Sequence, residues 1–267
     1  MSSGSHRRWF ATLLVGGAMM MAPLHSQTTK PRFDVTSVKP RSLTEGPTQG
    51  SRSGRLEMPN DTAWTVIRFA YDLATEAQVV GQLPDWAYTE SWSISGKSAD
   101  LIPSDQLRLM TQSLLEDRFS LKATLEERPL PHLEVVRART DGRLGPNIQA
   151  LETREQCADD KVRERMPSGG GGQGGCGPVT SLMQVVSVLT GQIVVDKTGL
   201  KVVAYRLFGL PGALTTLNQR LPPTAKAPAD VDAVRQAVND QLGLKLQASR
   251  EPVRALVIMS INRPDPN

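Results

Sequence analysis

Histidine, cysteine and the aromatic residues are scarce in this chain of 267 residues. It has three histidines and two cysteines, and phenylalanine, tryptophan and tyrosine together make up 4% of it. His6 and His25 lie near the N-terminus, which leaves His132 between Pro131 and Leu133. Zinc sites are built from several His and Cys ligands, and a Ser–His–Asp triad needs a histidine as its base. We therefore expect no metal, no cofactor and no catalytic residues, and we expect His132 to lie exposed in a turn.

A strong excess of charge of one sign is also absent. The chain has 31 Lys and Arg against 27 Asp and Glu, which gives a formal net charge of +4 at pH 7, and the two signs are mixed along its length. Nucleic-acid-binding proteins usually carry a clustered basic face. The composition therefore predicts no nucleic-acid partner.

The longest apolar run lies at the N-terminus and is too short to span a bilayer. Arg7 and Arg8 precede the run Trp9–Leu24, Pro23 interrupts it, and Ser26 offers a small residue for cleavage. This order is typical of a secretory signal, whereas a membrane-spanning helix needs about 20 apolar residues. Residues 1–26 are predicted to be a signal peptide, with an uncleaved anchor as the alternative. The mature chain is then expected in the periplasm or outside the cell, with no stable membrane anchor after cleavage.

The two cysteines, Cys157 and Cys176, predict a disulfide, because an isolated pair in an exported protein is usually oxidised. They lie in residues 140–178, a stretch that also contains the glycine run 169–172. The run lacks the Lys-Ser/Thr ending of a phosphate-binding loop. We therefore interpret residues 140–178 as a glycine-rich linker held by the disulfide.

The rest of the chain repeats itself. Five residues recur at a constant offset of 123 positions: Asp117, Leu121, Lys122, Pro129 and Leu133 return as Asp240, Leu244, Lys245, Pro252 and Leu256. Each copy has the pattern strand–helix–strand–strand–helix–strand–strand. The sequence therefore predicts an α+β fold of two related modules, residues 32–139 and 179–263, each with helices on one face of a mainly antiparallel sheet. Each module is expected to end in a hairpin.

Two short stretches contain the candidate binding residues. Asp196, Lys197 and Thr198 follow an apolar strand and precede Gly199. An Asp in a turn accepts hydrogen bonds from backbone amides, so these residues form either a structural turn or a ligand site. Trp86 and Trp92 flank a predicted turn, where they are either core residues or anchors for a protein partner.

Four motifs taken together resemble a known family. They are Ser37-Val38-Lys39-Pro40, Val195-Asp196-Lys197-Thr198-Gly199-Leu200, Gln241-Leu242-Gly243-Leu244-Lys245-Leu246 and the ending from Arg263-Pro264 to Asn267. In this order they resemble a large family of exported soil-bacterial proteins that is catalogued only as a domain of unknown function. Some members of that family are joined to, or encoded beside, a membrane sensor metallopeptidase. Where the family tends to have an acidic residue after a tyrosine, this chain has Tyr205-Arg206. The family offers no catalytic residues to carry over.

Each half also resembles the short N-terminal domain of secretins and TonB-dependent receptors, most clearly at residues 241–246. That resemblance implies a periplasmic module that contacts other proteins through its sheet and sheet edges. We therefore expect a non-enzymatic interaction or sensor module with a protein or cell-envelope partner. The alternative is a secreted carboxylate-dependent hydrolase of glycans or envelope material. That reaction needs two acids about 5–9 Å apart, for which Asp85 and Asp196 are candidates.

Overall fold

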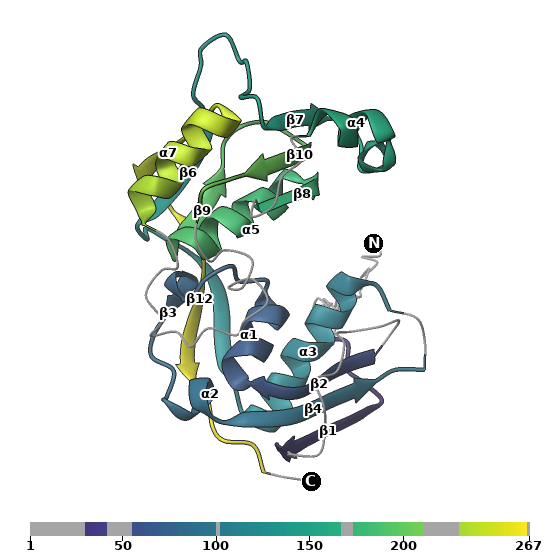
Figure 1. Cartoon of the computed structure of the whole chain (residues 1–267). Coiled ribbons are helices and arrows are strands. Elements are labelled where there is room, and N and C mark those ends of the chain that lie inside the picture. The colour runs from purple at the N-terminus through teal and green to yellow at the C-terminus, as the bar shows by residue number, and fades with distance from the viewer. Residues whose placement is uncertain (1–29, 42–54, 100–101, 167–172, 211–229, 266–267) are drawn as a thin grey trace, which may run out of the picture.

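The computed structural model describes residues 30–41, 55–99, 102–166, 173–210 and 230–265. The predicted signal peptide, residues 1–26, and the glycine run 169–172 lie outside these ranges. The described chain forms two lobes joined by long strands (Figure 1). Among the described residues, none of the helices combines the length and the apolar character that crossing a membrane requires.

The first lobe contains the N-terminal elements and the last strand of the chain. Its strands are β1 (Val35–Pro40), β2 (Arg55–Thr62), β3 (Val79–Val80), β4 (Ser91–Lys97), β5 (Lys122–Arg128) and β12 (Val253–Ser260). Its helices are α1 (Ala63–Tyr71), the 3-10 turn η1 (Glu76–Gln78), α2 (Trp86–Thr89) and α3 (Ser104–Phe119). Thr62 caps the start of α1, because its hydroxyl accepts a hydrogen bond from the Thr65 amide at 3.2 Å.

The second lobe contains the described elements between β5 and β12. Its strands are β6 (His132–Arg137), β7 (Ile148–Leu151), β8 (Gln173–Pro178), β9 (Ile193–Asp196), β10 (Val202–Leu207) and β11 (Leu244–Ser249). Its helices are η2 (Glu155–Ala158), α4 (Asp160–Arg165), α5 (Val179–Thr190) and α7 (Val231–Leu242). In Figure 1, α5 and α7 lie in the upper lobe, and α1 and α3 lie in the lower one.

The predicted α+β class and the repeated order of elements are confirmed. The order β2-α1-β3-β4-α3-β5-β6 in the first copy returns as β8-α5-β9-β10-α7-β11-β12 in the second. The sheets correspond as well: β1-β4-β2 matches β7-β10-β8, and β5-β12-β3 matches β11-β6-β9. Each of these three-stranded sheets has its counterpart in the other lobe.

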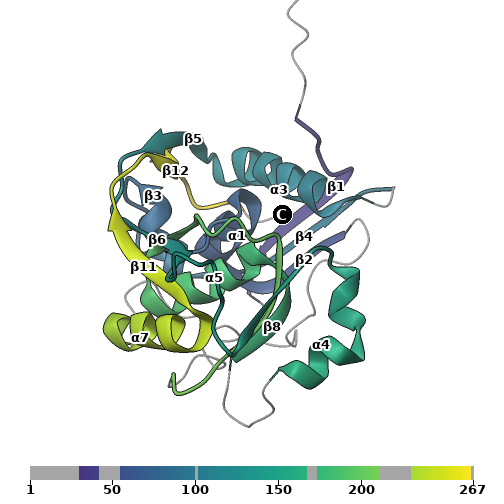
Figure 2. The same ribbon diagram turned by 90° about the horizontal axis from the view of Figure 1, so that it is seen from above.

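The two predicted hairpins are wrong, because the copies exchange their last strands. β6 lies between β9 and β11 in the second lobe, and β12 lies between β3 and β5 in the first. Arg128 lies opposite Val253 and Arg137 lies opposite Leu244, so one antiparallel register continues across the crossing. Figure 2 shows β11 and β12 as one long stretch, with β6 and β5 beside it. β5, β6, β11 and β12 are hereafter called the crossing ribbon.

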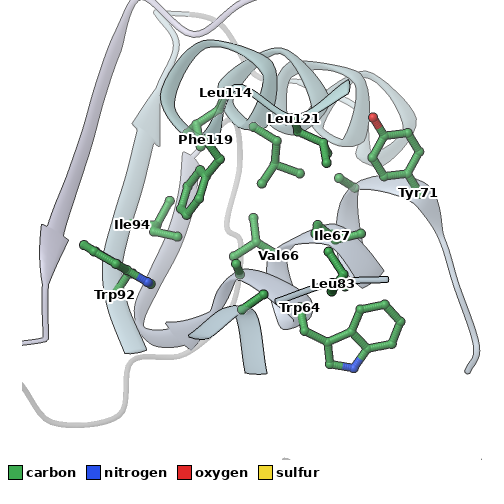
Figure 3. Close-up of a cluster of buried hydrophobic side chains, with 14 of the residues drawn as sticks. Trp64, Val66, Ile67, Tyr71, Leu83, Trp92, Ile94, Leu114, Phe119 and Leu121 are labelled. Atoms are coloured by element: carbon green, nitrogen blue, oxygen red, sulfur yellow. The ribbon is translucent and has the colours of Figure 1, made fainter. Parts of the chain in front are cut away.

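Each exchanged strand completes the core of the lobe that receives it. Leu256 and Ile258 of β12 belong to the first core. Figure 3 shows residues that α1 and α3 contribute to this core, among them Ile67 and Leu114. Leu133 and Val135 of β6 belong to the second core, with residues of α5 and α7. Full burial of one such aliphatic side chain contributes about 1.5–3 kcal/mol. The lobes are therefore tied together by their hydrophobic cores, and the packing modules differ from the contiguous ranges 32–139 and 179–263.

Residues 140–178 contain sheet strands, which differs from the predicted linker. β7 and β8 both pair antiparallel with β10. The predicted disulfide between Cys157 and Cys176 is present, with 5.6 Å between the two Cα atoms, and it ties η2 to β8. Glycine has a low strand propensity, which is why the sequence pattern of β8 reads as a flexible segment. This stretch is thus part of the second lobe's sheet.

Candidate functional site

The stretch Asp196–Gly199 forms a hydrogen-bonded turn at the end of β9. The Asp196 carboxylate oxygen Oδ1 accepts hydrogen bonds from the Thr198 amide at 2.9 Å and from the Thr198 hydroxyl at 2.7 Å. The Thr198 hydroxyl in turn accepts a hydrogen bond from the Leu200 amide at 3.1 Å. Gly199 has a φ of +69°, and a Cβ at this position would meet nothing within 4 Å. Backbone conformation, not lack of space, therefore explains the glycine.

This turn is fastened to β6. The Lys197 amide donates to the Val135 carbonyl at 2.9 Å, and the Arg137 Nε donates to the Thr198 carbonyl at 3.0 Å. Thr198 is buried. The side chains of Asp196 and Thr198 are thus engaged in holding the chain reversal between β9 and β10. Of the three predicted residues, Lys197 is the most exposed, whereas Asp196 is half-buried and Thr198 is buried.

Lys197 belongs to a charged cluster beside the crossing ribbon. Its ammonium nitrogen lies 3.3 Å from a carboxylate oxygen of Glu251 and 3.8 Å from one of Glu134. Glu134 lies on β6, and Glu251 lies in the connection between β11 and β12. The ammonium group therefore links the turn after β9 to the place where the chain passes between the lobes.

His132, predicted to be exposed, is only 2% exposed. It lies on the central strand β6, opposite Ser249 of β11 and Ile193 of β9, and neighbours on both sides enclose it. Its Nδ1 is 2.9 Å from the Leu130 carbonyl. A carbonyl only accepts hydrogen bonds, so Nδ1 carries the proton and donates it. A general base must lie within reach of its substrate, whereas this ring is enclosed by the strands around it. We therefore interpret His132 as an internal contact of the crossing ribbon.

The second group of predicted residues, Trp86 and Trp92, lies on and near α2. The two tryptophans differ in their exposure to solvent. Trp92 is 6% exposed and meets the Phe119 ring edge to face, with centroids 6.3 Å apart. Figure 3 shows Trp92 and Phe119 in the first core. Trp86 is partly exposed and stacks on Phe119 at 6.5 Å with 10° between the ring planes. Trp92 is therefore a core residue, and Trp86 is available as a surface group.

The guanidinium group of Arg263, in the C-terminal segment, packs over the ring of Trp86. The Arg263 Cζ lies 5.6 Å from the Trp86 ring centroid, within the range of a cation–π contact. The same guanidinium forks onto Glu90, with Nη2 2.8 Å from Oε1 and Nε 3.0 Å from Oε2. Trp86, Glu90 and the Phe119 ring that stacks on Trp86 are hereafter called the α2 cradle.

Hydrogen bonding sets the ionisation of this pair. The hydrogen bonds from Arg263 lower the pKa of the Glu90 carboxyl below its ordinary value of 4.5. The hydrogen bonds to Glu90 raise the pKa of the Arg263 guanidinium. Both groups therefore stay charged through the neutral range. Sequence reasoning missed Glu90, and it used Arg263 only within the C-terminal motif of the family resemblance.

A third feature is the outer edge of the second lobe's sheet. Within the described residues β8 pairs with β10 alone, and three of its positions are glycine: Gly174, Gly175 and Gly177. We call residues 174–177 the glycine edge. A Cβ at Gly175 would lie 3.5 Å from the Tyr205 ring, which is ordinary contact. The disulfide through Cys176 holds this strand in place.

A metal centre has no support in the part of the chain that the structure describes. No three His, Cys, Asp or Glu side chains come together there in an arrangement that could hold a metal ion.

These features define a two-lobed α+β protein whose halves exchange strands and whose distinctive residues lie at its surface connections and edges. A family model described as "Protein of unknown function (DUF3738)" matches residues 64–261, and the chain belongs to this family. No curated protein and no solved structure matches the chain.

Proposed function

We propose that this protein is an exported, non-enzymatic interaction module that binds a partner protein at the glycine edge of β8. In this mode an extended segment of the partner adds a strand to an open sheet edge, and backbone hydrogen bonds supply much of the affinity. The observation behind the proposal is that, within the described residues, positions 174–177 of this sheet edge carry no charged side chain, proline or bulge, and the single proline of β8, Pro178, is its last residue. Natural edge strands are normally guarded by charges, prolines or bulges.

The corresponding edge of the first lobe shows what such protection looks like. β2 occupies the place of β8, and it carries the ion pair Arg55–Glu57 at 3.0 Å. It also contains Pro59 and a register shift between Met58 and Asp61. Residues 174–177 of β8 have three glycines and a continuous register instead, and the proline of β8 lies at its end, at Pro178. The difference between two equivalent strands supports a binding role for β8.

The geometry of β8 also lowers the cost of binding. Glycine in a strand lets another backbone approach closely. The disulfide fixes Cys176 to η2, so the strand is ordered before a partner arrives, and preorganisation of this kind reduces the entropy lost on association. A disulfide in a chain with two cysteines is also consistent with the oxidising compartments outside the cytoplasm.

The test is affinity capture from the native cell envelope and secreted fraction, with three versions of the mature protein as bait. Gly175→Lys places a charge on the glycine edge, where an added Cβ meets only ordinary contacts. Thr124→Lys places the same charge on the exposed edge strand β5 and serves as the matched control. We expect wild type and Thr124→Lys to retain a specific partner and Gly175→Lys to lose it at least about tenfold.

Amide hydrogen exchange on the captured complex gives the second measurement. Strand addition predicts slower exchange at residues 174–177 when the partner is bound. Equal recovery of the partner by Gly175→Lys and wild type would contradict the proposal. So would the absence of any specific partner for all three baits.

A further inference from the structure

The α2 cradle has the chemistry of a receptor for arginine side chains. A guanidinium is planar, stacks on aromatic faces and presents two parallel donors to a carboxylate. Trp86 supplies the aromatic face and Glu90 supplies the two acceptor oxygens. Arg263 of the same chain uses both groups at once, so the structure itself shows which ligand chemistry the cradle accepts.

The cradle is built independently of the residue that fills it. Trp86 and Glu90 lie four positions apart on α2 and at its end, which places them on the same side. The Glu90 amide donates to the Trp86 carbonyl at 2.9 Å, and the Ala87 amide donates to the Pro84 carbonyl at 2.9 Å. Phe119 of α3 supports the indole ring from the core. None of these contacts involves Arg263, so the cradle should persist when the guanidinium leaves.

Arg263, the residue that fills the cradle, is bound to it by contacts that are largely exposed to solvent. Arg263 follows the end of β12, and the amide of the neighbouring Asn262 donates to the Phe119 carbonyl at 2.7 Å. The Arg263 and Glu90 side chains are 59% and 40% exposed. Exposed ion pairs are individually weak and are screened by salt. A second arginine held by additional contacts can therefore displace this one.

We propose that the α2 cradle binds an arginine of an extended segment of a partner protein, with Arg263 as the resident competitor. A lysine fits less well, because a point-charge ammonium cannot form the fork to Glu90. This site is on the first lobe and is distinct from the glycine edge, so it stands or falls independently of strand addition at β8.

The experiment uses the mature full-length protein and a blocked tetrapeptide with the chain's own sequence at residues 262–265, Asn-Arg-Pro-Asp. Binding is measured by calorimetry and by the NMR shift of the Trp86 indole N–H. We expect Arg263→Ala to bind this peptide at least about tenfold more tightly than wild type does. The same peptide with lysine in place of arginine should bind Arg263→Ala several-fold more weakly.

Glu90→Gln in the Arg263→Ala background supplies the control for the fork. It should abolish most of the peptide binding while circular dichroism and the melting temperature remain those of Arg263→Ala. Equal affinity of wild type and Arg263→Ala, or binding that Glu90→Gln does not weaken, would overturn the proposal. Capture of a partner at the glycine edge is scored separately with Gly175→Lys, so the two proposals fail by different measurements.

Discussion

The two lobes have the same framework but differ at two corresponding places on their surfaces. Between its third and fourth repeated elements the first lobe inserts α2 and the cradle, whereas the second lobe has the short Asp196–Gly199 turn. At the outer edge of the sheet, the first lobe has the charged and bulged β2, whereas the second has the glycine edge of β8. Connections and edges tolerate change because they contribute little to the core. The differences therefore point to the surfaces where the lobes have separate tasks.

What the lobes share is the packing that each needs. In both, a strand from the other half enters between two local strands and brings aliphatic residues into the core. Val79 lies opposite Leu256, and Val194 lies opposite Leu133. Leu133 and Leu256 are repeat mates, so the exchange obeys the symmetry of the duplication. The crossing ribbon is the common element that makes one protein of the two lobes.

The largest expected effect comes from the exchanged leucines. Leu256→Ala and Leu133→Ala each remove a buried side chain, 0% and 2% exposed, and each should cost about 2–5 kcal/mol of unfolding free energy. Hydrogen exchange locates the damage. Leu256→Ala should loosen β3 and β5 in the first lobe, and Leu133→Ala should loosen β9 and β11 in the second. If Leu256→Ala instead loosened the second lobe and Leu133→Ala loosened the first, each half would keep its own last strand.

The glycines that follow β3 and β9, Gly81 and Gly199, give the next comparison. Gly199→Ala forces a positive φ on alanine, at a cost of about 1–2 kcal/mol. Gly81 has a φ of +110°, and a Cβ there would lie 2.5 Å from the Ile258 carbonyl oxygen on the exchanged strand β12. Overpacking adds about 1–3 kcal/mol, so Gly81→Ala should be clearly worse in urea unfolding. Asparagine should rescue position 199 but not position 81, since only the latter has a steric conflict. Equal costs at the two positions would show that β12 does not press on Gly81.

The disulfide distinguishes the lobes further, since the first lobe contains no cysteine. The Cys157–Cys176 bond spans 19 residues, and Cys157→Ser/Cys176→Ser should lose about 3 kcal/mol by the chain-entropy relation. The loss should appear around α4, whose Val162 covers Leu151, Val202 and Ala204. Hydrogen exchange of the double variant and of the reduced wild type should agree. Loosening that begins in the first lobe would contradict this local role.

Sequence reasoning identified the repeat and the order of helices and strands within each copy, but it did not identify the strand partners, and the reason is physical. Because β6 and β12 are copies, each offers the same alternation of side chains to either lobe. A local hairpin and a reciprocal exchange therefore satisfy the same pattern. The exchange also explains why the prediction for His132 was wrong. Its neighbour Pro131 indicates an exposed turn, but the exchange places His132 on a central strand between β9 and β11. The contact of Arg263 with Trp86 joins distant segments, and no local pattern predicts it.

The smallest expected effect is the acid release of Arg263 from the α2 cradle. Because hydrogen bonds from Arg263 lower the pKa of Glu90, the contact is complete above the ordinary carboxyl value of 4.5 and is lost as the pH falls through the lowered value. Carboxyl-detected NMR should show Glu90 titrating below 4.5, together with a shift of the Arg263 Nε–H. In Arg263→Ala the Glu90 titration should return toward its ordinary range, and in Glu90→Gln the Arg263 signal should not respond to acid. If Glu90 titrated at 4.5 or above in wild type, the fork would be absent in solution and the cradle would lose its resident ligand. If Arg263 were released at low pH while the protein stayed folded, the first lobe would retain the α2 cradle without its guanidinium.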